Sequence, residues 1–238
     1  MRAPSATLFL LSYNEREAFE KLLPLIPLQL FNRVVGIDPG STDGTLELYE
    51  NAGIPYVLQP TRGRGNAFIQ AQDLCETDQL VFFSTDGNED PADLPRVLAF
   101  LDEGYDMVIA GRFVLPGSAS DNSDDPFLIR RYGSMTYSLI VRLLWRSGVY
   151  DACNGFRGYK LEAMKRMRLD APLHDIEIQS TIRAARLGMR VKEFPTREQL
   201  RMGGYHKATA GTLPLAWQTG RCVLRELFGA GSRSLVTK

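Results

Sequence analysis

The stretch at residues 82–91, FFSTDGNEDP, places acidic side chains where chemistry is expected. An apolar run changes there into three acids, Asp86, Glu89 and Asp90, separated by Gly and Asn. Carboxylates at the end of a buried strand are suitable ligands for a divalent cation that holds a phosphate. A solvated turn explains the same residues, with Asp90 as helix cap and Pro91 as the first helical residue. The segment alone leaves both interpretations open.

Three other polar stretches also follow apolar runs: SYNE at 12–15, DPGSTDGT at 38–45 and PTRGRGN at 60–66. In the last one, Gly63 and Gly65 precede a helical pattern, so that backbone N–H groups and Arg62 or Arg64 could face a phosphate. A G-x-G without a third glycine and a later acid is not a dinucleotide-binding fingerprint. Its meaning therefore depends on its place in the fold.

The elements that must position these stretches alternate between strand and helix over residues 1–112. The apolar runs ATLFLLS, RVVGID, IPYVLQ, QLVFFS and YDMVIAGR are separated by helical patterns, the first of which Asn14 is expected to cap. This alternation predicts an α/β fold with a mostly parallel sheet and helices on both faces. Open sheets of this kind bind ligands at the carboxyl ends of the strands, where the polar stretches fall.

The second half, residues 113–238, does not show this alternation of strands and helices. A loop rich in Ser, Gly and Asp is expected over 113–125, an apolar helix over 126–145, a helix at DIEIQSTIRAARLG, a strand at MRVKEFP and an amphipathic helix over 213–228. No linker composition separates the two halves. We therefore expect a single domain over residues 1–238.

Composition restricts the class of protein. With 238 residues, 44% hydrophobic and 24% charged, the chain is expected to be a soluble globular protein. A formal net charge of zero predicts no nucleic-acid partner. Three distant cysteines fit neither a disulfide framework nor a zinc site, which favours a cytoplasmic location. Neither a signal peptide nor an apolar run of membrane-spanning length is recognisable.

Six motifs occur in an order that resembles a known family: SYNERE, IDPGSTDGT, RGRGNAF, STDGNEDP, NGFRGYK and HDIEIQSTIRAARLGMRVKEFP. Together they resemble a family-2 glycosyltransferase of the GT-A fold, of the polyprenyl-phosphate, dolichol-phosphate mannose synthase-like type. The resemblance covers roughly residues 6–207. It implies that a sugar passes with inversion from a UDP- or GDP-sugar to an acceptor, with a polyprenyl phosphate at a membrane surface as the leading acceptor.

The resemblance also implies a donor site in the nucleotide-sugar-binding half, 1–112. Tyr13, Glu15 and Asp38 are expected to hold the nucleoside, since an aromatic face can stack on a base and carboxylates accept from base N–H groups or ribose hydroxyls. In the alternative, Glu15 only begins a helix and Asp38 only caps a turn. The remaining donor-binding residues implied by the resemblance are Arg62, Arg64, Asn66, Thr85, Asp86, Arg201 and Lys207.

The family usually carries an Asp-x-Asp pair for Mg²⁺ or Mn²⁺ after its fourth strand, whereas this chain has Ser84, Thr85 and Asp86. One carboxylate with substrate phosphates can hold such a cation, so we expect Asp86, assisted by Glu89, as metal ligands. Two alternatives remain: a metal-independent enzyme that neutralises the diphosphate with arginines, and a non-catalytic nucleotide-sugar-binding protein.

The acceptor-binding half, 113–238, supplies further charged candidates. Arg130 and Arg131 are expected to contact the acceptor or donor phosphate, and the loop with Arg201 and Lys207 to close over the donor. A lipid phosphate needs no general base. A hydroxyl of a small molecule or glycan does, and Asp175 in HDIEIQ is the expected base, with Glu177 and His174 as other candidates.

The helix expected over 213–228 has apolar residues on one side and Arg221 and Arg225 on the other. A basic amphipathic helix can lie on an anionic membrane surface. Packing against the core or in a homodimer explains the same pattern. We expect peripheral binding on the cytoplasmic face of a membrane.

Overall fold

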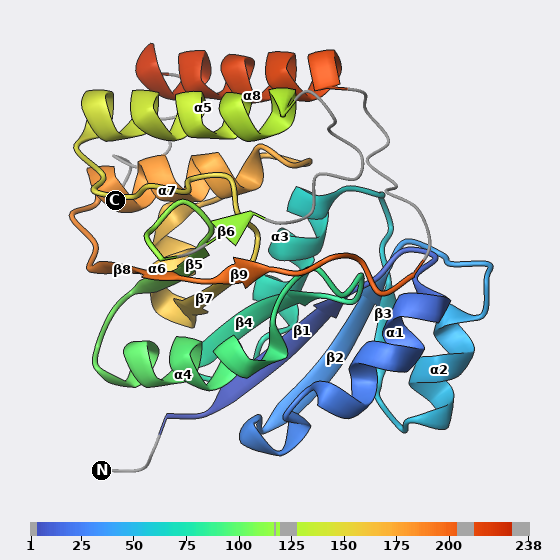
Figure 1. Ribbon diagram of the computed structural model, residues 1–238. Helices are drawn as coiled ribbons and strands as arrows, with labels where there is room; N and C mark the ends of the chain where they lie inside the picture. Colours follow the sequence, from blue (N-terminus) through green and yellow to red (C-terminus); the bar gives the residue numbers. More distant parts are fainter. Residues whose placement is uncertain (1–3, 117, 120–127, 204–211, 230–238) are drawn as a thin grey trace.

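The computed structural model describes residues 4–116, 118–119, 128–203 and 212–229. A seven-stranded sheet in the order β3-β2-β1-β4-β7-β5-β8 forms the centre of the protein, with helices on both faces (Figure 1). Its strands are β1 (Ala6–Leu11), β2 (Arg33–Asp38), β3 (Tyr56–Leu58), β4 (Gln79–Ser84), β5 (Met107–Gly111), β7 (Arg157–Lys160) and β8 (Val191–Pro195). The expected α/β fold with a mostly parallel sheet is confirmed.

Alternate residues of the buried strands point into two apolar cores. On β1, Phe9 packs into one core with Phe68 and Phe82, whereas Leu8 and Leu10 pack into the other. Helices α1 (Arg16–Leu22), α2 (Thr45–Asn51) and α4 (Leu94–Asp102) cover the Leu8 face, and α3 (Arg64–Leu74), α6 (Leu161–Met167) and α7 (Ile176–Arg186) cover the Phe9 face.

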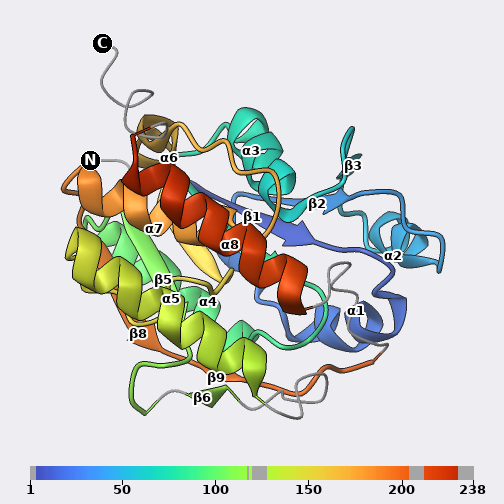
Figure 2. The same ribbon diagram turned by 90° about the horizontal axis from the view of Figure 1, so that it is seen from above.

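Two long helices form a further layer outside α7. Helices α5 (Ile129–Trp145) and α8 (Thr212–Leu227) lie side by side and pack on α7 and on each other (Figure 2). Both agree closely with the expected helices over 126–145 and 213–228. Among the helices in the described ranges, none combines the length and the apolar character needed to cross a bilayer.

Strand β7 was not predicted and runs antiparallel to its neighbours β4 and β5. Its sequence, RGYK, has neither the length nor the apolar character of the other strands. Gly158 lets α4 approach the sheet, because a Cβ atom there would lie 2.4 Å from Cγ1 of Val97. Arg157 is fully buried and donates hydrogen bonds to carbonyl and hydroxyl groups around α7, including the hydroxyl of Ser180.

In the part of the chain that the structure describes, short 3-10 helices lie at Leu23–Leu25, Leu28–Leu30 and Pro91–Asp93. The third begins as expected, because Asp90 accepts a hydrogen bond from the backbone N–H of Ala92 and Pro91 follows it. Strands β6 (Ser118–Ala119) and β9 (Arg197–Glu198) form a separate parallel pair.

The expected cap of the first helix was wrong. Asn14 has a left-handed backbone with φ of 50°, and α1 begins after Glu15 without a side-chain cap. The side chain of Asn14 instead accepts a hydrogen bond from the backbone N–H of Thr42. It thereby joins the loop after β1 to the loop after β2, which both lie at the carboxyl edge of the sheet.

Candidate functional site

A cavity of about 400 Å³ opens at the carboxyl ends of β1, β2 and β4, where the sequence predicted a ligand. We call it the donor cavity. Six of the predicted donor-binding residues line it: Tyr13, Glu15, Arg62, Arg64, Asp86 and Arg201. They come from loops far apart in the sequence and are brought together by the parallel strands.

Arg201 joins two acids at this cavity. Its Nη1 atom lies 3.0 Å from Oδ2 of Asp86, and its Nη2 atom lies 2.6 Å from Oε1 of Glu15. The side chains of Arg201 and Glu15 are 10% and 9% exposed, so water screens this ion pair only weakly. The loop after β9 is thus tied to the loop after β1 across the cavity mouth.

Arg62 and Tyr13 form a second contact at the cavity. The guanidinium carbon of Arg62 lies 3.7 Å from the centre of the Tyr13 ring, a cation–π geometry. The aromatic face that was expected to stack on a base therefore carries an arginine in this conformation. A planar base entering the cavity would meet both side chains.

Arg64 enters the site from the first turn of α3 and holds three groups together. It donates from Nε to Oε1 of Glu177 at 2.5 Å and from Nη1 to the hydroxyl of Ser84 at 3.3 Å, and its Nη2 lies 3.8 Å from Oε1 of Glu89. Gly155 makes room for this guanidinium, because a Cβ atom there would lie 1.8 Å from Nη2. Arg64 is therefore a fixed cation beneath the donor cavity.

Glu89 is held in place by Ser84, whose backbone N–H and hydroxyl both donate to its carboxylate. Burial raises the pKa of Glu89 to about 7, assisted by the negative charge of Asp86 and opposed by Arg64. The carboxylate that was expected to assist Asp86 thus faces Ser84 and Arg64. It does not line the donor cavity.

The expected metal ligands do not form a preformed cation site in this conformation. No cluster of three His, Cys, Asp or Glu side chains occurs within the ranges that the structure covers. Asp86 lines the cavity, but one of its oxygens accepts from the backbone N–H of Asn88 and the other from Arg201. A cation at Asp86 would therefore share this carboxylate with Arg201 or take its place.

Three predicted donor-binding residues form hydrogen bonds within or between loops and do not line the donor cavity. Asp38 is buried and accepts hydrogen bonds from the backbone N–H groups of Gly40 and Ser41, as the turn-cap alternative described. Asn66 donates to the carbonyl of Thr61, and Thr85 donates to the hydroxyl of Ser12. Lys207 lies outside the described residues.

A second cavity of about 290 Å³ lies between α5, α7 and α8. We call it the acceptor cavity. Its basic and acidic residues are Arg112, Arg130, His174 and Glu177, and uncharged side chains of the three helices form much of the rest. His174 lines both cavities, so the two spaces meet at this residue. Arg131 lines neither cavity.

Of the two acids of HDIEIQ, Glu177 and not Asp175 lines the acceptor cavity. Its side chain is 3% exposed, and its Oε2 atom has no hydrogen-bond partner among the described residues. The Asp175 carboxylate instead accepts a hydrogen bond from Nε2 of Gln218 on α8 and lines neither cavity. Burial raises the pKa of Asp175.

The sequence profile described as glycosyl transferase family 2 matches residues 7–168 of the chain. The chain belongs to glycosyl transferase family 2. It is a nucleotide-sugar-dependent glycosyltransferase, as the motifs predicted, and the non-catalytic alternative is set aside.

Two relatives of this family 2 enzyme are about equally similar. Glycosyltransferase AglJ of Haloferax volcanii is 30% identical over 200 residues, which cover 82% of this chain and 64% of AglJ. The chain thus spans less than two thirds of that relative. Polyprenol monophosphomannose synthase of Mycolicibacterium smegmatis is 30% identical over 202 residues, which cover 77% of this chain and 73% of the relative.

A solved structure confirms the GT-A type of fold. Glucosyl-3-phosphoglycerate synthase of Mycobacterium tuberculosis, solved with Mn²⁺, UDP and glucosyl-3-phosphoglycerate, superimposes with a TM-score of 0.73 at 18% identity. The superposition covers 94% of this chain and 80% of that chain. At this identity the likeness concerns the fold only.

Proposed function

We propose that this family 2 glycosyltransferase moves a hexose with inversion from a UDP- or GDP-sugar to a polyprenyl phosphate at a membrane surface. The observation that carries the proposal is the acceptor cavity, which meets the donor cavity at His174. Arg112 and Arg130 line it, and Arg112 is held there by a bidentate ion pair with the buried Asp151. Ile129 and Leu215 belong to its apolar wall. An amphiphile with an anionic head and a hydrocarbon tail matches this combination.

The helices above the acceptor cavity have a surface suited to a membrane. Helix α5 contains no acid, and Glu226, the single acid of α8, is fully buried. Their exposed apolar side chains, which we call the α5–α8 surface, include Tyr132, Leu139, Leu143, Leu213, Trp217 and Leu224. Arg221 of α8 is exposed, whereas the two helices expose no acid. An apolar surface with this charge pattern favours an anionic bilayer.

The relative named polyprenol monophosphomannose synthase supports a lipid acceptor. A phosphate acceptor is its own nucleophile and needs no general base, which agrees with an Asp175 that faces α8. In this proposal the arginines hold the acceptor phosphate near the sugar, and the enzyme acts mainly by positioning and charge stabilisation.

One observation favours a second candidate, transfer to a hydroxyl of a small molecule or glycan. The unpartnered Oε2 atom of Glu177 at the acceptor cavity is suited to accept a proton from a hydroxyl. Under this alternative Glu177 takes the role that was expected of Asp175. A hydroxyl acceptor then requires the charged form of Glu177, whereas a phosphate acceptor does not.

We further propose that Mg²⁺ or Mn²⁺ accompanies the donor, with Asp86 as its protein ligand. The solved structure with Mn²⁺ and UDP supports this proposal by analogy of fold. A bound cation would supply positive charge that stabilises the leaving diphosphate. Arg201 and Arg64 lie beside the same cavity and provide permanent positive charge there.

The test is a transfer assay with radiolabelled UDP- and GDP-hexoses and three acceptors: a polyprenyl phosphate, the matching polyprenol and a soluble glycan. The proposal expects label in a lipid phosphate product that mild acid releases. A variant with Glu177→Gln should retain this transfer if phosphate is the nucleophile. Label only in the polyprenol or glycan product, lost in Glu177→Gln, would establish the alternative.

A further inference from the structure

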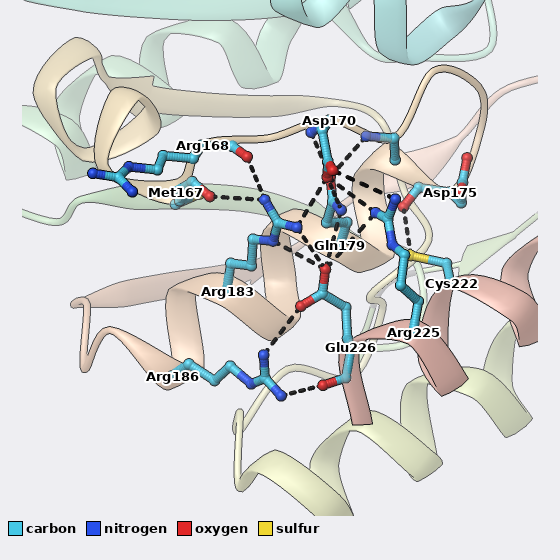
Figure 3. Close-up of polar contacts among 11 residues, drawn as sticks. Met167, Arg168, Asp170, Asp175, Gln179, Arg183, Arg186, Cys222, Arg225 and Glu226 are labelled. Carbon is cyan, nitrogen blue, oxygen red and sulfur yellow. Dashed lines mark hydrogen bonds and ion pairs between the residues drawn. The ribbon is translucent and has the colours of Figure 1, made fainter. Parts of the chain in front are cut away.

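A buried charge cluster lies between α7 and α8 (Figure 3). Its charged residues Arg183, Arg186 and Glu226 line neither cavity. At its centre is Glu226 of α8, whose side chain is fully buried. Its Oε1 atom accepts from Nη2 of Arg183 at 2.8 Å, and its Oε2 atom accepts from Nη1 of Arg186 at 3.2 Å. Arg183 is also fully buried, so neither charge is compensated by water.

The cluster continues from Glu226 into the loop between α6 and α7, residues 168–175. Gln179 donates from Nε2 to Oε1 of Glu226 at 3.1 Å, and its own Oε1 accepts from the backbone N–H groups of Asp170 and Ala171. The carboxylate of Asp170 accepts from Gln179 and from Arg183. Glu226 therefore fixes the two side chains that hold this loop.

The other side of the same loop is part of the donor site. The carbonyl of Pro172 accepts from the backbone N–H of Asn66 at 3.0 Å, in the first turn of α3. At Gly65 a Cβ atom would lie 1.9 Å from the carbonyl oxygen of Ala171, so loop and helix are in close contact. Leu173 and His174, the next residues of the loop, line the donor cavity.

We propose that Glu226 is a positioning residue for the donor cavity. It acts through Gln179 and Arg183 on the α6–α7 loop, and the loop in turn fixes the first turn of α3 beside Arg64. The bond from Gln218 to Asp175 ties the far end of the loop to the same helix. The position of α8 is thus transmitted to the wall of the donor cavity through contiguous hydrogen bonds. This inference concerns nucleotide binding and does not depend on which acceptor is used.

The test compares Glu226→Gln with the wild type by calorimetric titration of UDP and GDP. The substitution keeps the shape of the side chain but leaves Arg183 and Arg186 without its negative charge. We expect the Kd of the nucleotide that binds to rise at least about fivefold, a typical coupling between linked sites. Leu101→Ala on α4 is the control, because Leu101 is buried in the core on the opposite face of the sheet. This variant should lose stability without a matching change in Kd.

Amide hydrogen exchange supplies a readout that does not need a ligand. Loosening of the loop should accelerate exchange of the Asn66 N–H in Glu226→Gln but not in Leu101→Ala. Asp170→Asn serves if Glu226→Gln does not fold, because the Asp170 side chain is 56% exposed and the change is milder. Unchanged exchange at Asn66 and unchanged nucleotide affinity in a folded variant would overturn the proposal. If neither nucleotide binds the wild type, the donor assignment fails. The exchange rate of the Asn66 N–H then tests by itself whether Glu226 positions the loop.

Discussion

Arg64 and Glu177 are joined by a hydrogen bond of 2.5 Å between Nε and Oε1, although they are 113 residues apart in the sequence. Arg64 lines the donor cavity and Glu177 lines the acceptor cavity. The pair therefore forms part of the wall between the two proposed substrates. Because the Glu177 side chain is 3% exposed, this wall is costly to break.

Replacing Arg64 by Met should destabilise the protein by about 3 kcal/mol, because it leaves two buried carboxylates without their cation. Adding Glu177→Met should restore at least about 1 kcal/mol, since the uncompensated charge is removed. Urea denaturation of the wild type, both single variants and the double variant measures this coupling. Additive losses would show that the two side chains do not depend on each other.

Gly155→Ala should weaken nucleotide binding, because the added Cβ would occupy the place of the Arg64 guanidinium. We expect a loss of about tenfold in affinity, together with about 1–3 kcal/mol of stability. Gly158→Ala is the matched control, since its Cβ would meet Val97 and not a site residue. Titration of the nucleotide into both variants separates the effects. Equal affinities in the two variants would mean that Gly155 has no special role at the site.

The free energy of unfolding should depend on pH through the protonation of Glu89. Its pKa is raised from 4.5 to about 7 in the folded protein, so the folded state binds more protons than the unfolded state between these values. The stability that the protonated Glu89 side chain contributes is fully present below about pH 4.5 and is lost as the pH rises through about 7. Glu193, also raised to about 7 by burial, acts in the same direction.

Glu89→Gln should therefore be more stable than the wild type at pH 8, by up to about 3 kcal/mol, and should lose this advantage near pH 4.5. Chemical denaturation at both pH values measures the difference. A variant that is less stable than the wild type at pH 8 would show that the carboxylate is charged and needed by Arg64.

Binding to anionic vesicles should depend on the α5–α8 surface. Trp217 is 73% exposed, and Trp217→Glu should lower the vesicle-bound fraction about tenfold, because an aromatic ring is replaced by a charge that anionic lipid repels. Leu58→Glu on β3 is the control, since Leu58 is 55% exposed and is not part of the α5–α8 surface. Flotation with vesicles of phosphatidylcholine and phosphatidylserine gives the readout. Equal losses in both variants would argue against a specific surface.

Much of the sheet could be predicted from the sequence, because β1, β2, β4 and β5 are apolar runs followed by polar turns. Strand β7 could not, since its residues RGYK become a strand only by insertion between two buried neighbours. Tyr13, Glu15 and Asp86, predicted to bind the donor, follow strands and line the cavity. Their position depends on topology, which the alternation of elements indicates.

The acids of HDIEIQ were harder to assign. Asp175 and Glu177 are two residues apart at the start of α7, and only the packing of α8 turns one toward Gln218 and the other toward a cavity. The roles of Gln218 and of Gly155, which belongs to the NGFRGYK motif, could not be predicted, because their partners are more than 40 and more than 90 residues away, respectively. Such contacts are tertiary and leave no periodic pattern in the chain.

The most direct test of the account is calorimetric titration of UDP and GDP, with and without Mn²⁺, into the wild type and an Arg201→Gln variant. The account predicts that one of the two nucleotides binds, and that binding weakens at least about tenfold when the guanidinium that joins Asp86 and Glu15 is removed. If neither UDP nor GDP binds the wild type, with or without Mn²⁺, the assignment of the donor cavity is contradicted.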